Sequence, residues 1–227
     1  MILKKYICII PARGNSKEIK NKNLKKINNK SLIEITYTEA KRSKIFDKIF
    51  ISTESNRIRS KFPKIIPFLR PKKLSEDHVH VSEVVIHALN EFRKLGLTYT
   101  NVVMLLPTSP LRKSKHIIES IKLFEKNKSK SLISITDTGK LMTNLRFLGN
   151  NNRLLYFDKK IKRNISRQSS KSIFAVNGSI FISNVKSFMK HKTFHTDNAI
   201  GYKMSNFESV DINTKEDLML AKLMYDN

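Results

Sequence analysis

The 227 residues contain no tryptophan and one cysteine, Cys8, which lies within an apolar stretch. A single cysteine cannot form an internal disulfide, which excludes the disulfide-stabilised scaffolds of small secreted proteins. No apolar run reaches the roughly 18 residues that a transmembrane helix needs. The N-terminal apolar run ends at Pro11 and Arg13, which makes it too short for the core of a signal peptide. We therefore expect a reduced cytoplasmic protein that does not enter a membrane.

Acidic residues are also scarce. The 19 Asp and Glu residues face 44 Lys and Arg residues, and the formal net charge is +25. Such a charge attracts polyanions and anionic substrates. The basic residues are spread along the chain, and no zinc-finger, homeodomain or RNA-recognition signature accompanies them. We therefore do not expect general nucleic-acid binding and favour an enzyme that handles phosphates.

Apolar runs and amphipathic segments alternate along most of the chain. Strands are predicted at 6–10, 48–53, 65–66, 102–106, 132–135 and 178–182, and helices at 31–44, 82–95, from 114 and from 214. This alternation predicts one α/β domain over residues 1–227, folded as a three-layer α/β/α sandwich. The polar and basic segment at about 137–174 breaks the alternation, and we expect it to form a projecting arm.

The loop after the first predicted strand is the strongest candidate for a ligand site. It carries Arg13, Lys17 and Lys22 around the flexible Gly14. In α/β proteins a ligand crevice forms at the carboxyl ends of the strands, where glycine allows close approach to a phosphate and basic side chains neutralise it. Considered alone, the loop is equally compatible with an ordinary solvated basic segment.

Six separated motifs then occur in the order and at the spacing of one family. They are Pro11-Ala12-Arg13-Gly14-Asn15-Ser16-Lys17 with Lys22-Asn23; Ile51-Ser52-Thr53; Leu69-Arg70-Pro71 with Leu74 and Asp77; Leu106-Pro107-Thr108-Ser109-Pro110-Leu111-Arg112; Arg167-Gln168 with Asn177-Gly178-Ser179-Ile180-Phe181-Ile182; and Ser209-Val210-Asp211-Ile212-Asn213-Thr214. Together they resemble the cytidylyltransferases that activate sialic acids and related nonulosonic acids. The resemblance implies a Rossmann-like nucleotidyltransferase fold and a reaction in which a sugar hydroxyl attacks the α-phosphate of CTP.

The resemblance also implies roles for individual residues. Arg13, Lys17, Lys22 and Asp211 would be the catalytic residues, with Mg²⁺ held by Asp211 and Asn213. Arg70 would lie against the cytosine. The other substrate-binding residues would be Asn15, Ser16, Asn23, Leu106, Thr108, Ser109, Arg167, Gln168 and Asn177.

Arg167 and Gln168 belong to the arm, which in the family crosses to a second subunit, so a homodimer is implied. The chain departs from the family pattern at Asn213, where an aspartate is usual, and at Leu106, where a glutamine is usual. These changes favour a different nonulosonic acid or a weakened enzyme. The alternatives are activation of 3-deoxy-manno-octulosonate, which the arm motif disfavours, and a non-catalytic basic nucleotide- or nucleic-acid-binding relative.

Overall fold

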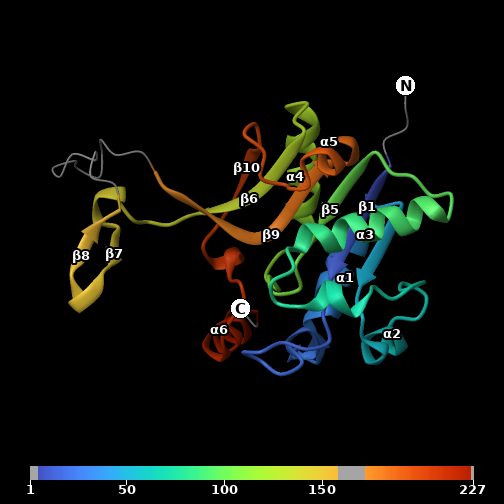
Figure 1. Cartoon of the computed structure of the whole chain (residues 1–227), viewed down its shortest axis with the longest axis horizontal. Coiled ribbons are helices and arrows are strands. Elements are labelled where there is room, and N and C mark those ends of the chain that lie inside the picture. The colour runs from blue at the N-terminus through green and yellow to red at the C-terminus, as the bar shows by residue number, and fades with distance from the viewer. Residues whose placement is uncertain (1–4, 158–171, 226–227) are drawn as a thin grey trace.

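The computed structural model describes residues 5–157 and 172–225, and a six-stranded sheet forms its centre (Figure 1). The strand order is β10-β6-β9-β5-β1-β4. Strand β9 pairs antiparallel with β5 and β6, and the remaining neighbours pair in parallel. The strands are β1 (Tyr6–Pro11), β4 (Lys48–Ser52), β5 (Asn101–Met104), β6 (Ser131–Asp137), β9 (Phe174–Asn184) and β10 (Ile200–Met204).

Helices cover both faces of this sheet. Helices α1 (Leu32–Arg42) and α4 (Ser114–Lys126) contact each other. Helices α3 (Val81–Lys94) and α5 (Val185–His191) line a shared surface pocket. Between these layers the first five residues of β1 are buried. A strand covered on both faces needs apolar side chains on both. This explains its unbroken apolar sequence, and the mixed α/β sandwich predicted from the sequence is confirmed.

Local signals placed several helix boundaries correctly. Ser31 and Glu34 form the predicted capping box at the start of α1, with the Glu34 amide donating to Ser31 Oγ. Gly96 follows α3 with φ of 74°, a conformation that favours glycine. At the start of α6 (Lys215–Tyr225), the Asp217 carboxylate accepts the Thr214 amide, and the Asp217 amide donates to Thr214 Oγ1. These boundaries therefore depend on short-range hydrogen bonds that the sequence reveals.

The predicted strand at Ile65–Ile66 is wrong. After α2 (Asn56–Lys61), the amides of Ile65 and Ile66 both donate to the Phe62 carbonyl, so the chain turns back on itself. Ile66 is buried in the core without strand pairing. The apolar pair thus reports burial and not strand structure. Strand β10 and helix α5, both short, were not predicted.

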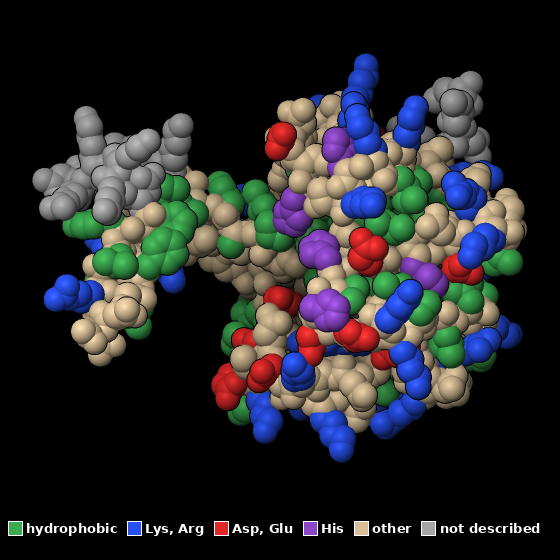
Figure 2. All heavy atoms as spheres, viewed as in Figure 1, with side chains coloured by type: hydrophobic (Ala, Val, Ile, Leu, Met, Phe, Trp, Pro, Cys, Tyr) green, Lys and Arg blue, Asp and Glu red, His purple; other side chains and the backbone are tan. Residues whose placement is uncertain are grey.

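The predicted arm contains a hairpin of β7 (Arg146–Leu148) and β8 (Leu154–Tyr156). Figure 1 shows it standing away from the sandwich, beyond the ends of β6 and β9. Arg167 and Gln168 fall in the segment 158–171, outside the described residues. On the face in Figure 2, Lys and Arg side chains are dispersed over the body, whereas apolar side chains gather on the arm.

Two further short strands, β2 (Lys26–Ile27) and β3 (Lys30–Ser31), follow the basic loop. A small apolar cluster joins this region to α1 and α6 through Ile27, Ile35 and Ala221. The C-terminal segment therefore packs beside the basic loop. Of the helices in the described ranges, none is long and apolar enough to cross a membrane.

Candidate active site

A pocket of about 310 Å³ opens where β1 ends and the basic loop begins. Its walls come from this loop, from the segment before α3 and from the loop after β5. The lining includes seven of the predicted site residues: Arg13, Ser16, Lys22, Asn23, Arg70, Leu106 and Thr108. The sequence therefore located this pocket, at the carboxyl end of the first strand.

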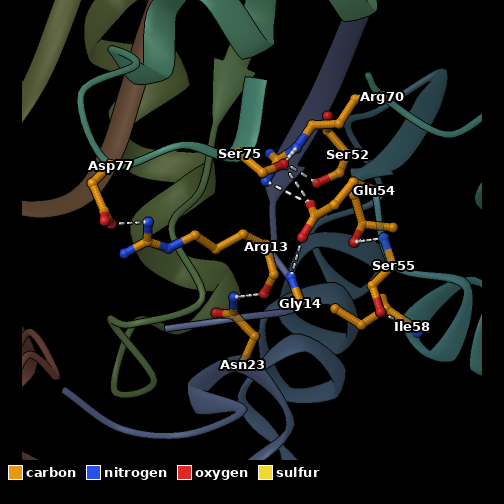
Figure 3. Close-up of polar contacts among 11 residues, drawn as sticks. Arg13, Gly14, Asn23, Ser52, Glu54, Ser55, Ile58, Arg70, Ser75 and Asp77 are labelled. Carbon is orange, nitrogen blue, oxygen red and sulfur yellow. Dashed lines mark hydrogen bonds and ion pairs between the residues drawn. The ribbon is translucent and has the colours of Figure 1, made fainter. Parts of the chain in front are cut away.

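Internal hydrogen bonds hold the basic loop in shape. Asn23 is buried and donates its amide to the Arg13 carbonyl at 2.9 Å (Figure 3). Lys22 Nζ donates to the Ile212 carbonyl at 2.9 Å, which ties the loop to the C-terminal segment. Asn15 is exposed, whereas the hydroxyl of Ser16 is buried without a hydrogen-bond partner. The loop thus presents cationic side chains on a fixed backbone.

Asp77 lies opposite the loop and pairs with two of its cations. Arg13 Nη1 and Lys17 Nζ each lie 2.6 Å from a carboxylate oxygen of Asp77. The hydrogen bonds from Lys17 and Arg13 hold the pKa of this carboxyl below its ordinary value. Lys17 does not itself line the pocket, but Asp77 does. Asp77 belonged to a recognised motif, yet no local pattern predicts its pairing with Arg13 across 64 residues.

Arg70 reaches the pocket from the opposite wall and is buried. Its guanidinium donates to Glu54 Oε2 at 3.0 Å, to Ser75 Oγ at 2.9 Å and to the Ser52 carbonyl at 3.4 Å. Burial lowers the pKa of Arg70, although Glu54 acts in the opposite direction. These three acceptors fix the plane of the guanidinium beside the pocket. Neither Glu54 nor Ser75 was among the predicted site residues.

The loop after β5 is held by a buried arginine. Arg112 Nη1 donates to the carbonyls of Leu106 at 3.1 Å and Ser179 at 2.8 Å, and its burial lowers its pKa to about 10. The Thr108 carbonyl accepts the Ile212 amide at 2.8 Å. Leu106 and Thr108 thereby line the pocket next to the C-terminal segment. The buried hydroxyl of Ser109 has no hydrogen-bond partner and lies outside the lining.

Asn177 also lies outside the pocket lining, and its amide bonds within the protein. Its Oδ1 accepts from Ser134 Oγ at 2.6 Å, and its Nδ2 donates to Ser209 Oγ at 2.9 Å. Asn177 therefore joins β6 and β9 to the segment that leads to Asp211. This placement supports a positioning role more directly than contact with a nucleotide.

The predicted metal ligands Asp211 and Asn213 lie outside the pocket lining. The Asp211 side chain packs against Gly178, 3.6 Å from where a Cβ on that glycine would lie, and Leu106 lies equally close to that position. The Asp211 charge also acts on Lys22. Asp211 Oδ2 accepts from Asn213 Nδ2 at 3.0 Å, while Asp211 Oδ1 is buried without a hydrogen-bond partner. A buried, unpaired carboxylate oxygen is suited to a cation.

The chemistry around Asp211 limits what can bind a cation. Within the described ranges, no three His, Cys, Asp or Glu side chains come together as a metal site. The Asn213 amide directs its Nδ2 toward Asp211, so it would have to present its Oδ1 instead to share a cation with Asp211. One carboxylate with neutral oxygens and water is compatible with Mg²⁺, which keeps several waters in most protein sites.

The comparisons with known proteins agree with this geometry. A family model described as cytidylyltransferase matches residues 7–225. The chain is 33% identical over 223 residues to an N-acylneuraminate cytidylyltransferase of Escherichia coli, covering 96% of this chain and 51% of that protein. It is 29% identical over 224 residues to a pseudaminic acid cytidylyltransferase of Campylobacter jejuni, covering 97% and 96% of the two chains. The chain thus spans about half the length of the former relative and nearly all of the latter.

The fold is also that of solved nucleotidyltransferases. A structure of CMP:2-keto-3-deoxy-manno-octonic acid synthetase complexed with CTP superposes with a TM-score of 0.73 at 11% identity, over 98% of this chain and 99% of that one. At this identity the likeness establishes the fold alone.

Proposed function

The chain belongs to the cytidylyltransferase family and is a nucleotidyltransferase; we propose that it joins CMP from CTP to a sialic acid-like nonulosonic acid. The relatives named for N-acylneuraminate and pseudaminic acid support this substrate class. The observation that carries the proposal is that the basic loop and the buried Arg70 line one pocket. CTP is a cytoplasmic nucleotide, and the unpaired, buried Cys8 supports that compartment.

In this reaction a hydroxyl oxygen of the sugar forms a bond to the α-phosphorus of CTP. The bond between the α-phosphorus and the oxygen that bridges it to the β-phosphate breaks. Pyrophosphate leaves with that bonding pair, and the hydroxyl proton is released. Catalysis of such a transfer depends on positioning and on stabilising charge on the phosphate oxygens. Arg13, Lys17 and Lys22 would neutralise the triphosphate, and Arg70 would hold the cytosine.

We also propose that Asp211 and Asn213 hold Mg²⁺. The unpaired Asp211 Oδ1 supports this assignment, and Lys22 lies close to the same carboxylate. When bound, the ion would add positive charge beside the phosphate oxygens and orient them. With its amide turned so that Oδ1 takes the place of Nδ2, Asn213 would contribute a neutral oxygen in place of a second carboxylate, so metal binding would be weaker than with two acids.

The proposal is tested by pyrophosphate release from CTP with Mg²⁺ and a panel of sugars. The panel contains N-acetylneuraminic, legionaminic and pseudaminic acids, and 3-deoxy-manno-octulosonate. We expect release with one nonulosonic acid and a loss of at least about tenfold in Arg13→Ala. Arg42→Ala is the control, because Arg42 lies on α1 and pairs with Glu39 away from the pocket.

Two results would replace this proposal. Turnover of 3-deoxy-manno-octulosonate alone would assign the neighbouring activity. No turnover, together with RNA or DNA binding that weakens steeply with salt and no preference for cytosine, would indicate a polyanion-binding relative.

We propose further that the β7–β8 hairpin packs on a second copy of the chain. Its side chains Phe147, Leu148, Leu154 and Leu155 are each more than half exposed. Phe147 lies opposite Leu155 and Leu148 opposite Leu154, so the hairpin exposes one apolar pair on each face, which favours a protein partner. In the dimer Arg167 and Gln168 would contribute to the partner's sugar site, as the family pattern implies.

Sedimentation of Leu148→Lys tests the dimer. We expect it to sediment as a monomer at concentrations where the unmodified protein is a dimer. The matched control is Leu95→Lys, because Leu95 is 60% exposed beyond the end of α3 and remote from the hairpin. Equal sedimentation of the two variants would contradict the hairpin interface.

A further inference from the structure

Glu54 follows β4 and lies between the two halves of the candidate nucleotide site. One carboxylate oxygen, Oε1, accepts the backbone amide of Gly14 at 2.7 Å. The other, Oε2, accepts from Arg70 Nη2 at 3.0 Å and from Ser75 Oγ at 2.7 Å. Figure 3 shows the side chain pointing between the basic loop and the Arg70 guanidinium. Glu54 does not line the pocket itself, so it can act only through these neighbours.

The basic loop closely approaches the Glu54 segment. A Cβ on Gly14 would lie 2.8 Å from Ser55 Cβ and 3.3 Å from Glu54 Oε1, so only glycine allows this backbone approach. The Gly14 amide is consequently turned toward Glu54. The carboxylate thereby sets the direction of the backbone from which Arg13 and Ser16 reach the pocket.

On its other side Glu54 neutralises a buried cation. The Arg70 side chain is 3% exposed and that of Glu54 is 14% exposed. Burial acts to raise the pKa of Glu54, but hydrogen bonds from Ser75 and Gly14 and the charge of Arg70 hold it below its ordinary value. Arg13 acts electrostatically on Arg70, so without Glu54 two cations would repel each other across the pocket.

We infer that Glu54 is a positioning residue that couples the phosphate-binding loop to the base-binding Arg70 through its two carboxylate oxygens. This inference rests on the proposed function, because it assigns the triphosphate to one side of Glu54 and cytosine to the other. It predicts that one carboxylate outside the pocket governs both the affinity for the triphosphate and the preference for the base.

The test measures binding of CTP, UTP and inorganic tripolyphosphate by calorimetry to Glu54→Gln. In either orientation of the new amide, an N–H faces the Gly14 amide or the Arg70 guanidinium, and the charge opposite Arg70 is lost. We expect CTP affinity to fall about tenfold, as for loss of one charge-assisted hydrogen bond. Because the inference couples the loop to Arg70, we expect both a smaller preference for CTP over UTP and weaker tripolyphosphate binding, and a change in only one of them would overturn the coupling.

Glu39→Gln is the matched control. Glu39 is a buried carboxylate that likewise accepts a backbone amide, from Ser114 at 2.7 Å, and an arginine, Arg42 at 2.8 Å, but it lies away from the pocket. Both variants should lower the melting temperature, and only Glu54→Gln should change ligand binding. The inference is overturned if Glu54→Gln binds all three ligands within about twofold of the unmodified protein. If the unmodified protein shows no preference for CTP over UTP, the proposed function fails instead.

Discussion

The charged groups in two regions around the pocket differ in how far hydrogen bonds within the chain satisfy them. On the Arg70 side, each guanidinium nitrogen donates to an acceptor within the protein, and Glu54 uses both oxygens. On the Asp211 side, one buried carboxylate oxygen has no hydrogen-bond partner. A buried carboxylate oxygen without a hydrogen-bond partner destabilises the folded state unless a ligand or ion binds it. The first side is therefore preorganised, and the second depends on what it binds.

The largest effect that tests this difference should come from Asp211→Asn, which removes the charge on the incomplete side. We expect turnover to fall at least about a hundredfold, the size typical for loss of one group that stabilises charge in a transition state. Binding of CTP without Mg²⁺ should change little, because the Arg70 side is intact. The measurement is the rate of pyrophosphate release at saturating CTP and sugar.

Asp217→Asn is the control for this loss. Asp217 lies in the same segment and accepts the amides of Asn213 and Thr214 at the start of α6. It should lower the melting temperature through loss of this cap and leave turnover largely unchanged. If the two variants lost turnover equally, Asp211 would be a structural carboxylate, and the contrast between the two sides would not hold.

The same contrast explains what the sequence could predict. The basic loop and the Ser31 capping box depend on residues within a few positions of each other, and both were found. The Glu54–Arg70 pair spans 16 residues and the Arg13–Asp77 pair 64, so neither has a local signal. The family resemblance brought Asp211 to attention, but only the structure shows which of its oxygens is unpaired.

Burial without periodicity misled the prediction elsewhere. Ile65–Ile66 has the composition of a strand, but its two amides bond back to Phe62, and no local pattern announces that turn. Strand β10 contains Gly201 and Lys203, both exposed, among its five residues. It is a strand because it pairs with β6 at the edge of the sheet. Local hydrogen bonds decided the first outcome, and tertiary pairing, which overrides local preference, decided the second.

Lys22 connects the two sides, and its titration gives the next prediction. Burial, with a smaller contribution from Arg13, lowers the pKa of Lys22 despite the nearby Asp211. In the free enzyme Lys22 should therefore lose its proton below the ordinary lysine value of about 10.4. We expect kcat/KM for CTP to fall about tenfold per pH unit above that lowered pKa. Because the pKa of Lys22 is lowered in the folded state, folding becomes slightly more favourable as pH rises through that pKa. Deprotonation of Lys22 would therefore lower kcat/KM without unfolding the protein.

Lys22→Arg is the check, since arginine stays protonated throughout this range. The alkaline decline should move to higher pH in the variant. The measurement is kcat/KM for CTP between pH 7 and 10.5, with circular dichroism at each pH. An unchanged decline in Lys22→Arg would assign the titration to another group.

Asn213→Asp should add a second carboxylate to the proposed Mg²⁺ site, with a smaller effect on turnover than Asp211→Asn. A second carboxylate beside Asp211 replaces the amide that now donates at 3.0 Å. Without Mg²⁺ the two acids repel, so the melting temperature should fall. With Mg²⁺ it should recover, and the Mg²⁺ concentration for half-maximal turnover should drop about fivefold, because carboxylate charge raises affinity for the ion. Unchanged Mg²⁺ dependence would exclude residue 213 from the metal site.

The smallest effect concerns Asp77, which pairs with Arg13 Nη1 and Lys17 Nζ of the basic loop. A triphosphate carries its own negative charge and must share these two cations with Asp77. Asp77→Asn should therefore tighten binding of tripolyphosphate about twofold to threefold, and less at high salt, as expected for exposed ion pairs. Glu76→Gln removes the same charge one residue away, where the carboxylate pairs with His78 instead. Tighter binding in both variants would reflect general repulsion. Weaker binding in Asp77→Asn alone would mean that Asp77 orients the two cations for the phosphates.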